Sequence, residues 1–448
     1  MSNHHLSRKK FLKKSAWGVA GFSLSPGMLS SMDSRQKPAL ENEMKKIESS
    51  ISYTLKNVRL ETGFEYDGEE IIGTKTELFT IEVADGKIKQ IRPNQPLSDA
   101  IDAKGLLMLP SFRDMHIHLD KTLYADKWRA VRRSGGIKGM IELEQRTLPD
   151  MLKNSTYKAE KLIELLQSYG TGFARSHVNI EPTSKLDSLK NLEIALANKK
   201  DSFGAELVAF PQHGLYYTDS LPYMKEAATM NIDFIGALDP TNVDGSIERT
   251  MDTTVQLALD HDKGIDIHLH ESGKSGHDTI DYLIKKVNEN PVLKGKTFVS
   301  HSFALATLSQ SQQEAFAERL AAAQIGIVST IPFGRLIMPI PTLLQHGVNV
   351  MTGNDSIVDY WSTMGTGSVL QKANLAAQLY GHTSEFGLSR LLKLATAGPI
   401  PLDDKGVQQW PKNGDDANFV LVEASCSAEA VSRMSPVRSL IYKGKVVY

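Results

Sequence analysis

Residues 110–124 read PSFRDMHIHLDKTLY and place two histidines, His116 and His118, just after an apolar run. In an extended strand, side chains two residues apart point to the same face, so both imidazoles project to one side. A histidine pair in this position either holds a metal ion or hydrogen-bonds to ordinary neighbours at the end of a strand. The residues at the ends of the other strands decide between these two interpretations.

Strand-like and helix-like segments alternate from about residue 106 to residue 400. In 158–166, for example, apolar residues recur at helical spacing, and Ser155 is expected to cap the helix that they form. The expected strands are 106–119, 172–179, 205–211, 233–237, 264–270, 297–301, 326–330 and 349–352. Eight strands alternating with helices predict an α/β fold, a distorted (β/α)8 TIM barrel. No Gly-x-Gly-x-x-Gly motif follows a strand, so a Rossmann fold lacks its fingerprint.

Both ends of the sequence after residue 50 contain short strands joined by turns. Asp85 and Gly86 form a turn signal near the start, and Gly444 marks another turn near the C-terminus. Neither end has enough apolar residues to be stable alone, so we expect the two to build one small composite β-sandwich. The predicted organisation is a leader at 1–50, a sandwich from 51–108 and 400–448, and a metal-dependent barrel over 109–399.

The first 50 residues differ in character from the rest. Residues 7–13 read SRKKFLK, and a weakly apolar stretch at 16–29 is followed by a polar segment. This order resembles a twin-arginine export signal in which Arg8 is followed by Lys9 instead of a second arginine. The apolar stretch is too short to cross a bilayer, so no membrane span is expected. We therefore expect export to the periplasm, with a disordered basic arm on a cytoplasmic protein as the alternative.

The composition limits the kinds of site that the chain can build. With 41% hydrophobic residues and a net charge of -1 over 448 residues, it is typical of a globular protein and shows no basic bias toward nucleic acid. Its single cysteine, Cys426, excludes an intramolecular disulfide framework and a cysteine-rich zinc site. A metal site would therefore need histidines and carboxylates.

Residues able to bind a metal stand at the ends of several predicted strands. His268 and His270 repeat the spacing of the first pair, with Glu271 just beyond them. His301 ends the next strand, and Asp355 follows the last one. In a parallel barrel all strands end at the same face, where active sites lie. The expected convergence of these side chains favours a metal site over separate structural histidines.

From about residue 50 onward, the chain resembles the cytosine deaminase-like branch of the amidohydrolase superfamily. The segment 110–124 is similar to the family's His-x-His-Leu-Asp motif. The segments that resemble its later motifs are FPQHG (210–214), HLHE (268–271), SH (300–301), GNDSIVDYW (353–361), and the closing ANFVLV and PVRSLIYKGKVV. The resemblance implies a distorted barrel with a sandwich from both termini, in agreement with the pattern of strands.

The resemblance also implies a chemistry for the strand-end residues. The implied ligands of one divalent metal ion, Zn²⁺ or Fe²⁺, are His116, His118, His268 and Asp355. Asp355 would take the proton of the attacking water, and His301 would orient the resulting hydroxide. Glu271 would carry protons to the ring and to the departing amine. These three residues form the predicted catalytic set.

Three further residues are predicted to contact the substrate. Gln212 has both the donor and the acceptor needed to bind a cyclic amide edge. Trp361 could form an aromatic wall over a flat ring, and His177 stands at the end of the second predicted strand. The expected partner is a small heterocyclic molecule. Because relatives often assemble, a homo-oligomer is compatible with the resemblance.

The expected activity is metal-dependent hydrolytic deamination or dealkylamination of a cytosine-like aromatic nitrogen heterocycle. The chain departs from the cytosine deaminase pattern at His270, Asn354 and Ser356, so we expect a different substrate preference. One alternative is a cyclic-amide hydrolase of the dihydropyrimidinase or dihydroorotase type, which normally needs a carboxylated lysine between two metal ions. The other is a non-catalytic periplasmic binding protein that retains the barrel.

Overall fold

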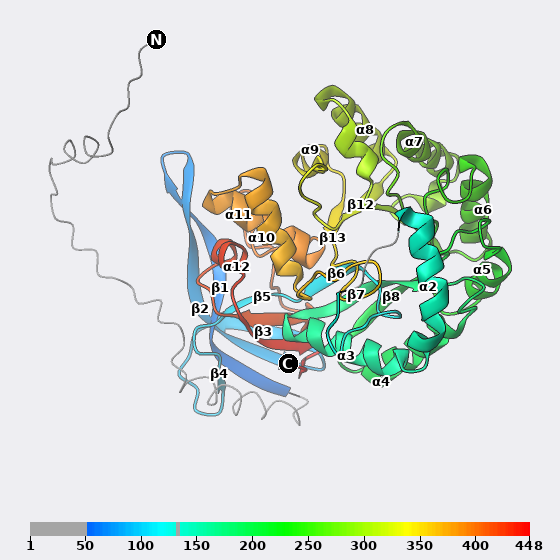
Figure 1. Cartoon of the computed structure of the whole chain (residues 1–448). Helices are drawn as coiled ribbons and strands as arrows, with labels where there is room; N and C mark the ends of the chain where they lie inside the picture. The colour runs from blue at the N-terminus through cyan, green and yellow to red at the C-terminus, as the bar shows by residue number, and fades with distance from the viewer. Residues whose placement is uncertain (1–51, 131–134) are drawn as a thin grey trace, which may run out of the picture.

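The computed structural model describes residues 52–130 and 135–448, which form a barrel with a second sheet beside it (Figure 1). Each of the two sheets in this part of the chain contains eight strands. The predicted leader at 1–50, with its export signal, lies outside the described residues.

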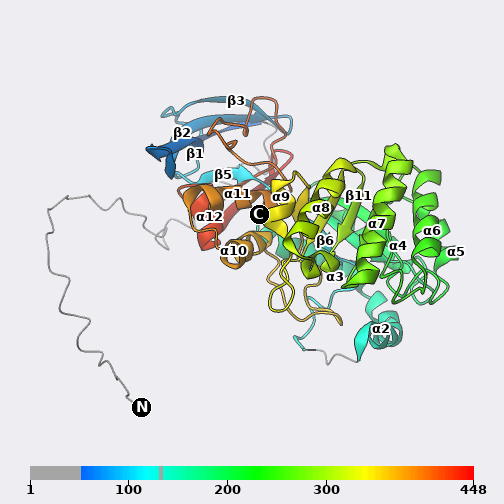
Figure 2. The ribbon, with the colours of Figure 1, turned by 90° about the horizontal axis from the view of Figure 1, so that it is seen from above.

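The barrel sheet follows the order of the sequence from β6 to β13, and its paired strands are all parallel. Its strands are β6 (Phe112–Ile117), β7 (Thr171–Asn179), β8 (Gly204–Phe210), β9 (Phe234–Ile235), β10 (Gly264–His268), β11 (Thr297–Ser300), β12 (Ile325–Ser329) and β13 (Val350–Thr352). Parallel neighbours require crossover connections, which helices supply on the outside of the sheet (Figure 2). The predicted distorted (β/α)8 barrel is confirmed.

Helices cover the barrel because each buries an apolar stripe against the strands. The helices along the barrel are α2 (Gly136–Leu152), α3 (Ser155–Ser168), α4 (Asp187–Lys199), α5 (Leu221–Ala228), α6 (Ile247–Asp260), α7 (Lys274–Glu289), α8 (Gln310–Ala322) and α9 (Ile340–Gln345). In α3, Leu162, Ile163 and Leu166 are buried, as their spacing predicts. The N-cap prediction was wrong: Ser155 is the first residue of α3, and Asn154 precedes it.

The strand predicted over 106–119 is two strands in two different sheets. β5 (Leu107–Pro110) pairs antiparallel with β14 (Phe419–Val422), whereas β6 pairs with β7 in the barrel. Between them, the amide of Ser111 donates to the carbonyl of Asn418 at 3.2 Å. An unbroken apolar run does not reveal this change of partner, because residues of both strands are buried.

The seam of the barrel lies between β6 and the residues that follow β13. Ile117 forms a parallel bridge with Asp355, whose amide donates to the carbonyl of His116 at 2.7 Å. Gly353 permits this approach, because a Cβ there would lie 2.4 Å from both N and O of His116. Asp355 has a φ of 64°, in the left-handed region. Asp355, at the C-terminal ends of the barrel strands, therefore also helps to close the barrel sheet.

Strands from both termini form the second sheet, in the order β16-β15-β14-β5-β1-β2-β3 with β4 beside β1. The strands not yet given are β1 (Ser52–Asp67), β2 (Glu70–Ala84), β3 (Lys87–Pro93), β4 (Ile101–Asp102), β15 (Val437–Tyr442) and β16 (Lys445–Val446). The predicted turns are confirmed: Asp85 and Gly86 have φ values of 51° and 73°, and Gly444 has 77°. Leu55 of β1 and Phe419 of β14 share one buried cluster, so strands from both termini pack together, as predicted. The predicted β-sandwich is a single eight-stranded sheet in the described residues, and its domain bounds stay a prediction.

Three helices follow the barrel strands and lie near the second sheet (Figures 1 and 2). They are α10 (Val369–Tyr380), α11 (Glu385–Thr396) and α12 (Ser427–Arg433).

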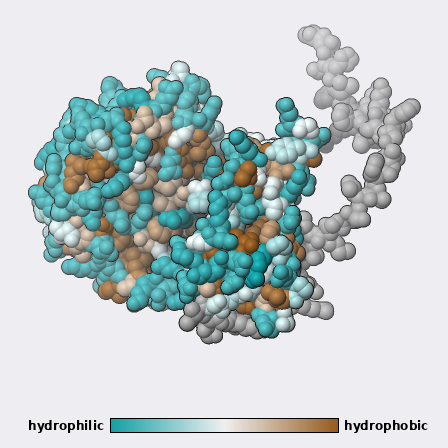
Figure 3. Space-filling model, turned by 180° about the vertical axis from the view of Figure 1, so that it is seen from behind, coloured by the Kyte–Doolittle hydropathy of each residue, from teal (hydrophilic) through white to brown (hydrophobic). Residues whose placement is uncertain are grey.

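No helix within 52–130 or 135–448 is long and apolar enough to cross a membrane. The face shown in Figure 3 is mainly hydrophilic, with apolar side chains in scattered patches, as is normal for a globular surface.

Candidate metal centre and active site

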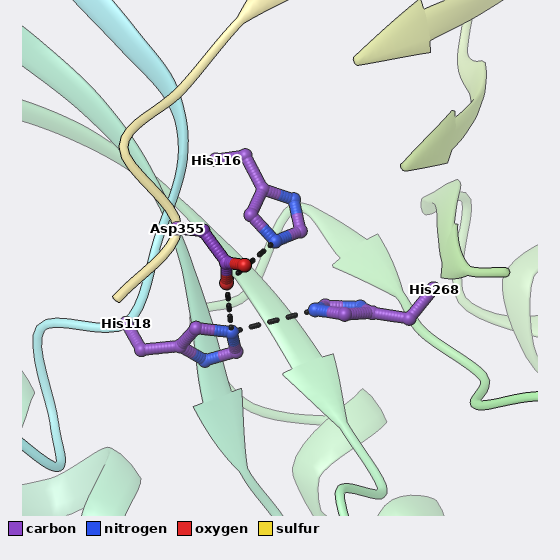
Figure 4. Close-up of side chains that lie close together, drawn as sticks. All are labelled: His116, His118, His268 and Asp355. Carbon is purple, nitrogen blue, oxygen red and sulfur yellow. Dashed lines mark hydrogen bonds and ion pairs between the residues drawn. The ribbon is translucent and has the colours of Figure 1, made fainter. Parts of the chain in front are cut away.

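Four side chains that are far apart in the sequence point toward one centre beside the ends of the barrel strands (Figure 4). Nε2 of His116 and Nε2 of His118 lie 3.5 and 3.4 Å from Oδ1 of Asp355. Nε2 of His268 lies 3.4 Å from Nε2 of His118. One ligand atom from each residue lies within 4.8 Å of the others, so all four could bind one ion. The structure thus brings together the whole predicted ligand set.

A chain of hydrogen bonds behind His116 orients its ring. Oγ of Ser300 donates to Oδ1 of Asp266 at 2.7 Å, so the same hydroxyl accepts from Nδ1 of His116 at 2.8 Å. The proton of the imidazole is therefore on Nδ1, and the lone pair of Nε2 faces the centre. Nε2 is buried and has no hydrogen-bond partner in the described part of the chain, as expected for an atom that binds a metal.

The ring of His118 is fixed in the same tautomer. Its Nδ1 lies 3.1 Å from the carbonyl oxygen of His177, which can only accept, so Nδ1 must donate. Burial and the nearby Lys121 ammonium lower the pKa of His118 to about 4, which keeps the ring neutral. Burial acts to raise the pKa of Asp355, but the neighbouring imidazoles of His116 and His118 hold it well below its usual value. Neutral imidazoles and an ionised carboxylate are the forms that bind metals.

These donors fit a divalent ion of the Zn²⁺ or Fe²⁺ type, so metal content gives a first prediction. Purified protein should hold about one divalent ion per chain, and Asp355→Ala should weaken metal affinity by at least about 10–100-fold. Ser300→Ala, which removes the partner of His116 and a donor to Asp266 but no predicted ligand, should have a smaller effect in the same direction. Elemental analysis after dialysis measures both. Full metal content in Asp355→Ala would contradict this assignment.

Glu271 has one oxygen occupied and one available. Its Oε1 accepts from the amides of Thr241 and Asn242 at 2.8 and 2.7 Å, whereas its buried Oε2 has no hydrogen-bond partner among the described residues. Helix α7 packs against it through Gly276, where a Cβ would lie 2.2 Å from the carbonyl oxygen of Glu271. Burial raises the pKa of Glu271, which favours a carboxyl group able to give a proton as well as to take one.

His301 lies beside the metal cluster, one residue after β11. Its φ of 68° turns it out of the strand, and its ring centroid is 4.8 Å from that of His116. On its other side is His270, at 4.3 Å between ring centroids. Nδ1 of His270 lies 3.1 Å from Oδ2 of Asp239. The predicted residues His301 and His270 are therefore both at the site, and Asp239, which the sequence did not single out, orients the second.

Comparison with known proteins agrees with this geometry. Residues 240–448 match the family model described as the amidohydrolase family. The uncharacterized protein YahJ of Escherichia coli strain K12 is 51% identical over 402 residues, which cover 88% of this chain and 87% of YahJ. The chain belongs to the amidohydrolase superfamily.

Two solved structures of amidohydrolases resemble this one closely. The crystal structure of N-isopropylammelide isopropylaminohydrolase from Burkholderia multivorans superposes with a TM-score of 0.77 at 25% identity, covering 89% of this chain and 98% of that one. That of 5-methylcytosine deaminase from Klebsiella pneumoniae, liganded with 5-fluorocytosine, has a TM-score of 0.73 at 25% identity, covering 88% and 97%. Both proteins are named for hydrolysis of a C–N bond on a nitrogen heterocycle, and the predicted resemblance to deaminases of this superfamily is confirmed.

In this amidohydrolase, Gln212 and Trp361 belong to one polar cluster with Lys121 and Glu144, which we call the lysine–glutamate cluster. Nζ of Lys121 donates to Oε1 of Gln212 and lies 3.3 Å from Oε1 of Glu144. Nε1 of Trp361 donates to Oε2 of Glu144 at 2.6 Å. Gln212 and Trp361, both predicted to contact substrate, are thus linked through Lys121 and Glu144. Glu144 lies in α2, and no sequence motif marks that helix as part of the site. Lys121 could have been found from its place directly after His-x-His-Leu-Asp.

His177, the third predicted substrate contact, is fully buried among the rings of the amidohydrolase site. Its ring centroid is 4.1 Å from that of His116 and 4.5 Å from that of His268. Neither ring nitrogen has a hydrogen-bond partner in the described residues, and Nε2 lies 3.9 Å from Oδ2 of Asp266. The structure therefore places His177 against two of the predicted metal ligands, and its contact with substrate stays a prediction.

His213 should make the stability of this amidohydrolase depend on pH. Its Nδ1 lies 3.2 Å from Glu181 and its Nε2 3.6 Å from Glu144. Burial alone would lower the pKa of His213, but the two carboxylates raise it to about 9. Since this exceeds the value of about 6.5 in an unfolded chain, the stabilisation is complete below about pH 6.5 and is lost as the pH rises through 9. The loss should be on the order of 2–3 kcal/mol.

Melting temperatures measured between about pH 6.5 and 9 test this prediction. The wild-type value should fall more steeply than that of His213→Gln, which lacks the titrating group. His382→Gln, a histidine substitution just after α10, should keep the wild-type slope. Parallel curves for wild type and His213→Gln would show that the two carboxylates do not hold a proton on His213.

Proposed function

We propose that this amidohydrolase hydrolyses the exocyclic C–N bond of an aminated aromatic nitrogen heterocycle and releases ammonia or an amine. The observation that carries the proposal is Glu271, three positions after His268 of the four-residue metal cluster: one oxygen is held by two backbone amides and the other is buried without a partner in the described residues. A proton carrier next to an activated water is what this reaction needs. The two solved relatives, named for a dealkylaminating and a deaminating hydrolase, support the same reaction class.

A divalent ion, Zn²⁺ or Fe²⁺, held by the four ligands would supply the Lewis acidity that makes water nucleophilic at neutral pH. Asp355, ionised at the centre, accepts a proton from the attacking water. Glu271 gives its proton to the ring nitrogen next to the attacked carbon, takes the proton of the newly added hydroxyl and passes it to the departing nitrogen, so the carbon keeps the new oxygen as a carbonyl. The proton held by Asp355 then returns Glu271 to its protonated form. His301, whose ring packs against that of His116, would orient the nucleophile and donate to the developing oxyanion.

The cyclic-amide hydrolase alternative gains no support from the barrel. Such enzymes place a carboxylated lysine at the end of the third or fourth barrel strand. Here β8 is followed by Pro211 and Gln212, and β9 by Gly236 and Ala237. The buried lysine of the site, Lys121, is already paired with Glu144.

A screen for ammonia and amine release tests the proposed function. Metal-loaded protein is assayed with cytosine, 5-substituted cytosines, isocytosine, creatinine-like rings, amino-triazines and N-alkylamino-triazines. We expect at least one ring to lose its amine and to gain one oxygen by mass spectrometry, and dialysis against a chelator to abolish the reaction. Opening of a cyclic amide without loss of an amine, together with two metal ions per chain, would favour the alternative instead.

A further inference from the structure

A cavity of about 650 Å³, which we call the flank cavity, lies between α3 and the segments that follow β6 and β13. The lining residues that matter below are Leu123, Tyr124, Trp128, Leu165 and Val358. None of the predicted metal, catalytic or substrate-binding residues is among those that line it in the described part of the chain. Its volume is within the range of about 300–1,000 Å³ that is usual for small-molecule pockets. It is therefore a candidate for a second binding site.

The charged side chains of the lining already have partners of opposite sign. Nζ of Lys161 lies 2.7 Å from Oε2 of Glu164, whose Oε1 lies 2.9 Å from Nζ of Lys199. Oδ2 of Asp126 lies 2.5 Å from Nζ of Lys158. A charged ligand would have to compete with these pairs and lose its own hydration. The flank cavity therefore suits a neutral molecule.

Two aromatic side chains of the lining have groups that the protein leaves unused. Trp128 is 71% exposed, so a large apolar ring faces solvent at the cavity. The hydroxyl of Tyr124 has no hydrogen-bond partner within 52–130 and 135–448. A tyrosine hydroxyl donates well to a carbonyl oxygen, and an indole ring packs on a flat apolar ring. The matching ligand has an apolar body and an oxygen that accepts a hydrogen bond.

One wall of the flank cavity continues into the metal centre. The amide of Leu123 donates to the carbonyl of Val358 at 2.7 Å, which ties the segment after β6 to the segment after β13. The same two segments meet closer to the strands, where the amide of His118 donates to the carbonyl of Asp355 at 3.1 Å. Val358 has a φ of 54°, a conformation that a β-branched residue keeps only when its surroundings hold it there. Contacts that fix Val358 therefore also help to fix two predicted metal ligands.

We propose that the flank cavity binds a neutral, mainly apolar molecule with a carbonyl oxygen, and that its occupation strengthens metal binding. The oxygen accepts from the hydroxyl of Tyr124, and the apolar body contacts Trp128 and Leu165. A molecule that fills the space between α3 and Val358 holds the two tied segments in the arrangement in which the metal ligands meet. By linkage, the metal raises the affinity for this molecule by the same factor. The inference goes beyond the proposed function and does not depend on the reaction.

Fluorine NMR with three matched probes tests the proposal on the full-length, metal-loaded protein. The probes are 4-fluoroacetophenone, which has a carbonyl oxygen, 4-fluoroethylbenzene, which lacks it, and 4-fluorobenzoate, which is charged. We expect the ketone to bind about fivefold more tightly than the hydrocarbon, which leaves the donor unpaired. The benzoate should bind more weakly than the ketone. Binding at the metal itself would give the opposite order, because a carboxylate is a stronger metal ligand than a ketone.

Three variants locate the bound ketone. Trp128→Ala removes an exposed side chain, so the fold should remain intact while the affinity for the ketone falls by about fivefold. Tyr124→Phe keeps the ring and removes only the hydroxyl, so the preference for the ketone over the hydrocarbon should disappear. Phe333→Ala is the matched control, because Phe333 is 70% exposed and does not line the flank cavity. It should bind the ketone as the wild type does.

Metal affinity gives a second readout that needs no turnover. Saturating ketone should raise the affinity for the metal by about fivefold in the wild type and in Phe333→Ala, but not in Trp128→Ala. The proposal would be overturned if the ketone did not bind, if Trp128→Ala or Tyr124→Phe behaved as the wild type, if the benzoate bound most tightly, or if ketone and metal bound independently. The proposed function fails separately, since a negative screen for ammonia and amine release would leave all of these measurements unchanged.

Discussion

Glu271→Gln should lower kcat by about 10² or more while leaving the metal content unchanged. Glutamine keeps an oxygen that can accept from the amides of Thr241 and Asn242, so the backbone around the site should stay in place. Its other terminal atom, however, is an amide nitrogen that cannot give a proton to the ring or to the departing amine. The measurement is the rate of ammonia or amine release, with elemental analysis of the same sample.

Glu289→Gln is the matched control for this variant. Glu289 is the last residue of α7, and within 52–130 and 135–448 its side chain makes only long ion pairs, with Lys285 and Lys286 at 3.8 and 3.9 Å. The same chemical change at this position should leave kcat within about twofold, because such surface pairs contribute little. Equal turnover by Glu271→Gln and wild type would remove Glu271 from the mechanism.

Arg175→Met should lower the free energy of unfolding by about 3–5 kcal/mol. Arg175 lies inside the barrel at 3% exposure, with Nη1 2.9 Å from Oδ2 of the fully buried Asp266. Its guanidinium also lies 4.1 Å from the ring centroids of both Phe234 and Phe298. Removing the cation leaves the Asp266 carboxylate buried without its charge partner. Because Asp266 also accepts from Ser300, the bond that orients His116 should weaken, and metal affinity should fall as well.

Arg319→Met gives the control for the arginine. This residue also pairs with an aspartate, Asp281, at 2.7 Å, and lies 5.3 Å from the Phe316 ring centroid, but its side chain is 47% exposed. Its loss should cost less than about 1 kcal/mol. Denaturant midpoints of the metal-free proteins measure both changes. If the denaturant midpoint fell by the same small amount in both variants, the buried Asp266 carboxylate would not depend on the charge of Arg175.

The sequence by itself determined the barrel and which side chains come together as a possible metal site. Both are written in local patterns: strands alternate with helices at regular intervals, and His116, His118, His268 and Asp355 stand at strand ends or just after them. Parallel strands in a barrel bring their C-terminal ends to one face, so position along each strand is enough to predict that these residues meet. The turns at Gly86 and Gly444 were equally local, because a left-handed backbone is a property of the residues in the turn.

Only the tertiary structure decided how the site is closed and held. The division of 106–119 between two sheets depends on pairing with β14, about 300 residues away, and nothing in the run itself marks it. Asp355 joins the seam of the barrel because Gly353 lets two backbones approach, which becomes visible only when both strands are present. Gln212 is bound by Lys121, 91 positions earlier, and Lys121 is held by Glu144 from a helix with no metal or substrate motif. The pattern of strands in the sequence shows which donors, acceptors and possible metal ligands each residue carries. Hydrogen bonds to residues distant in the sequence decide which of these groups remain free to bind a ligand.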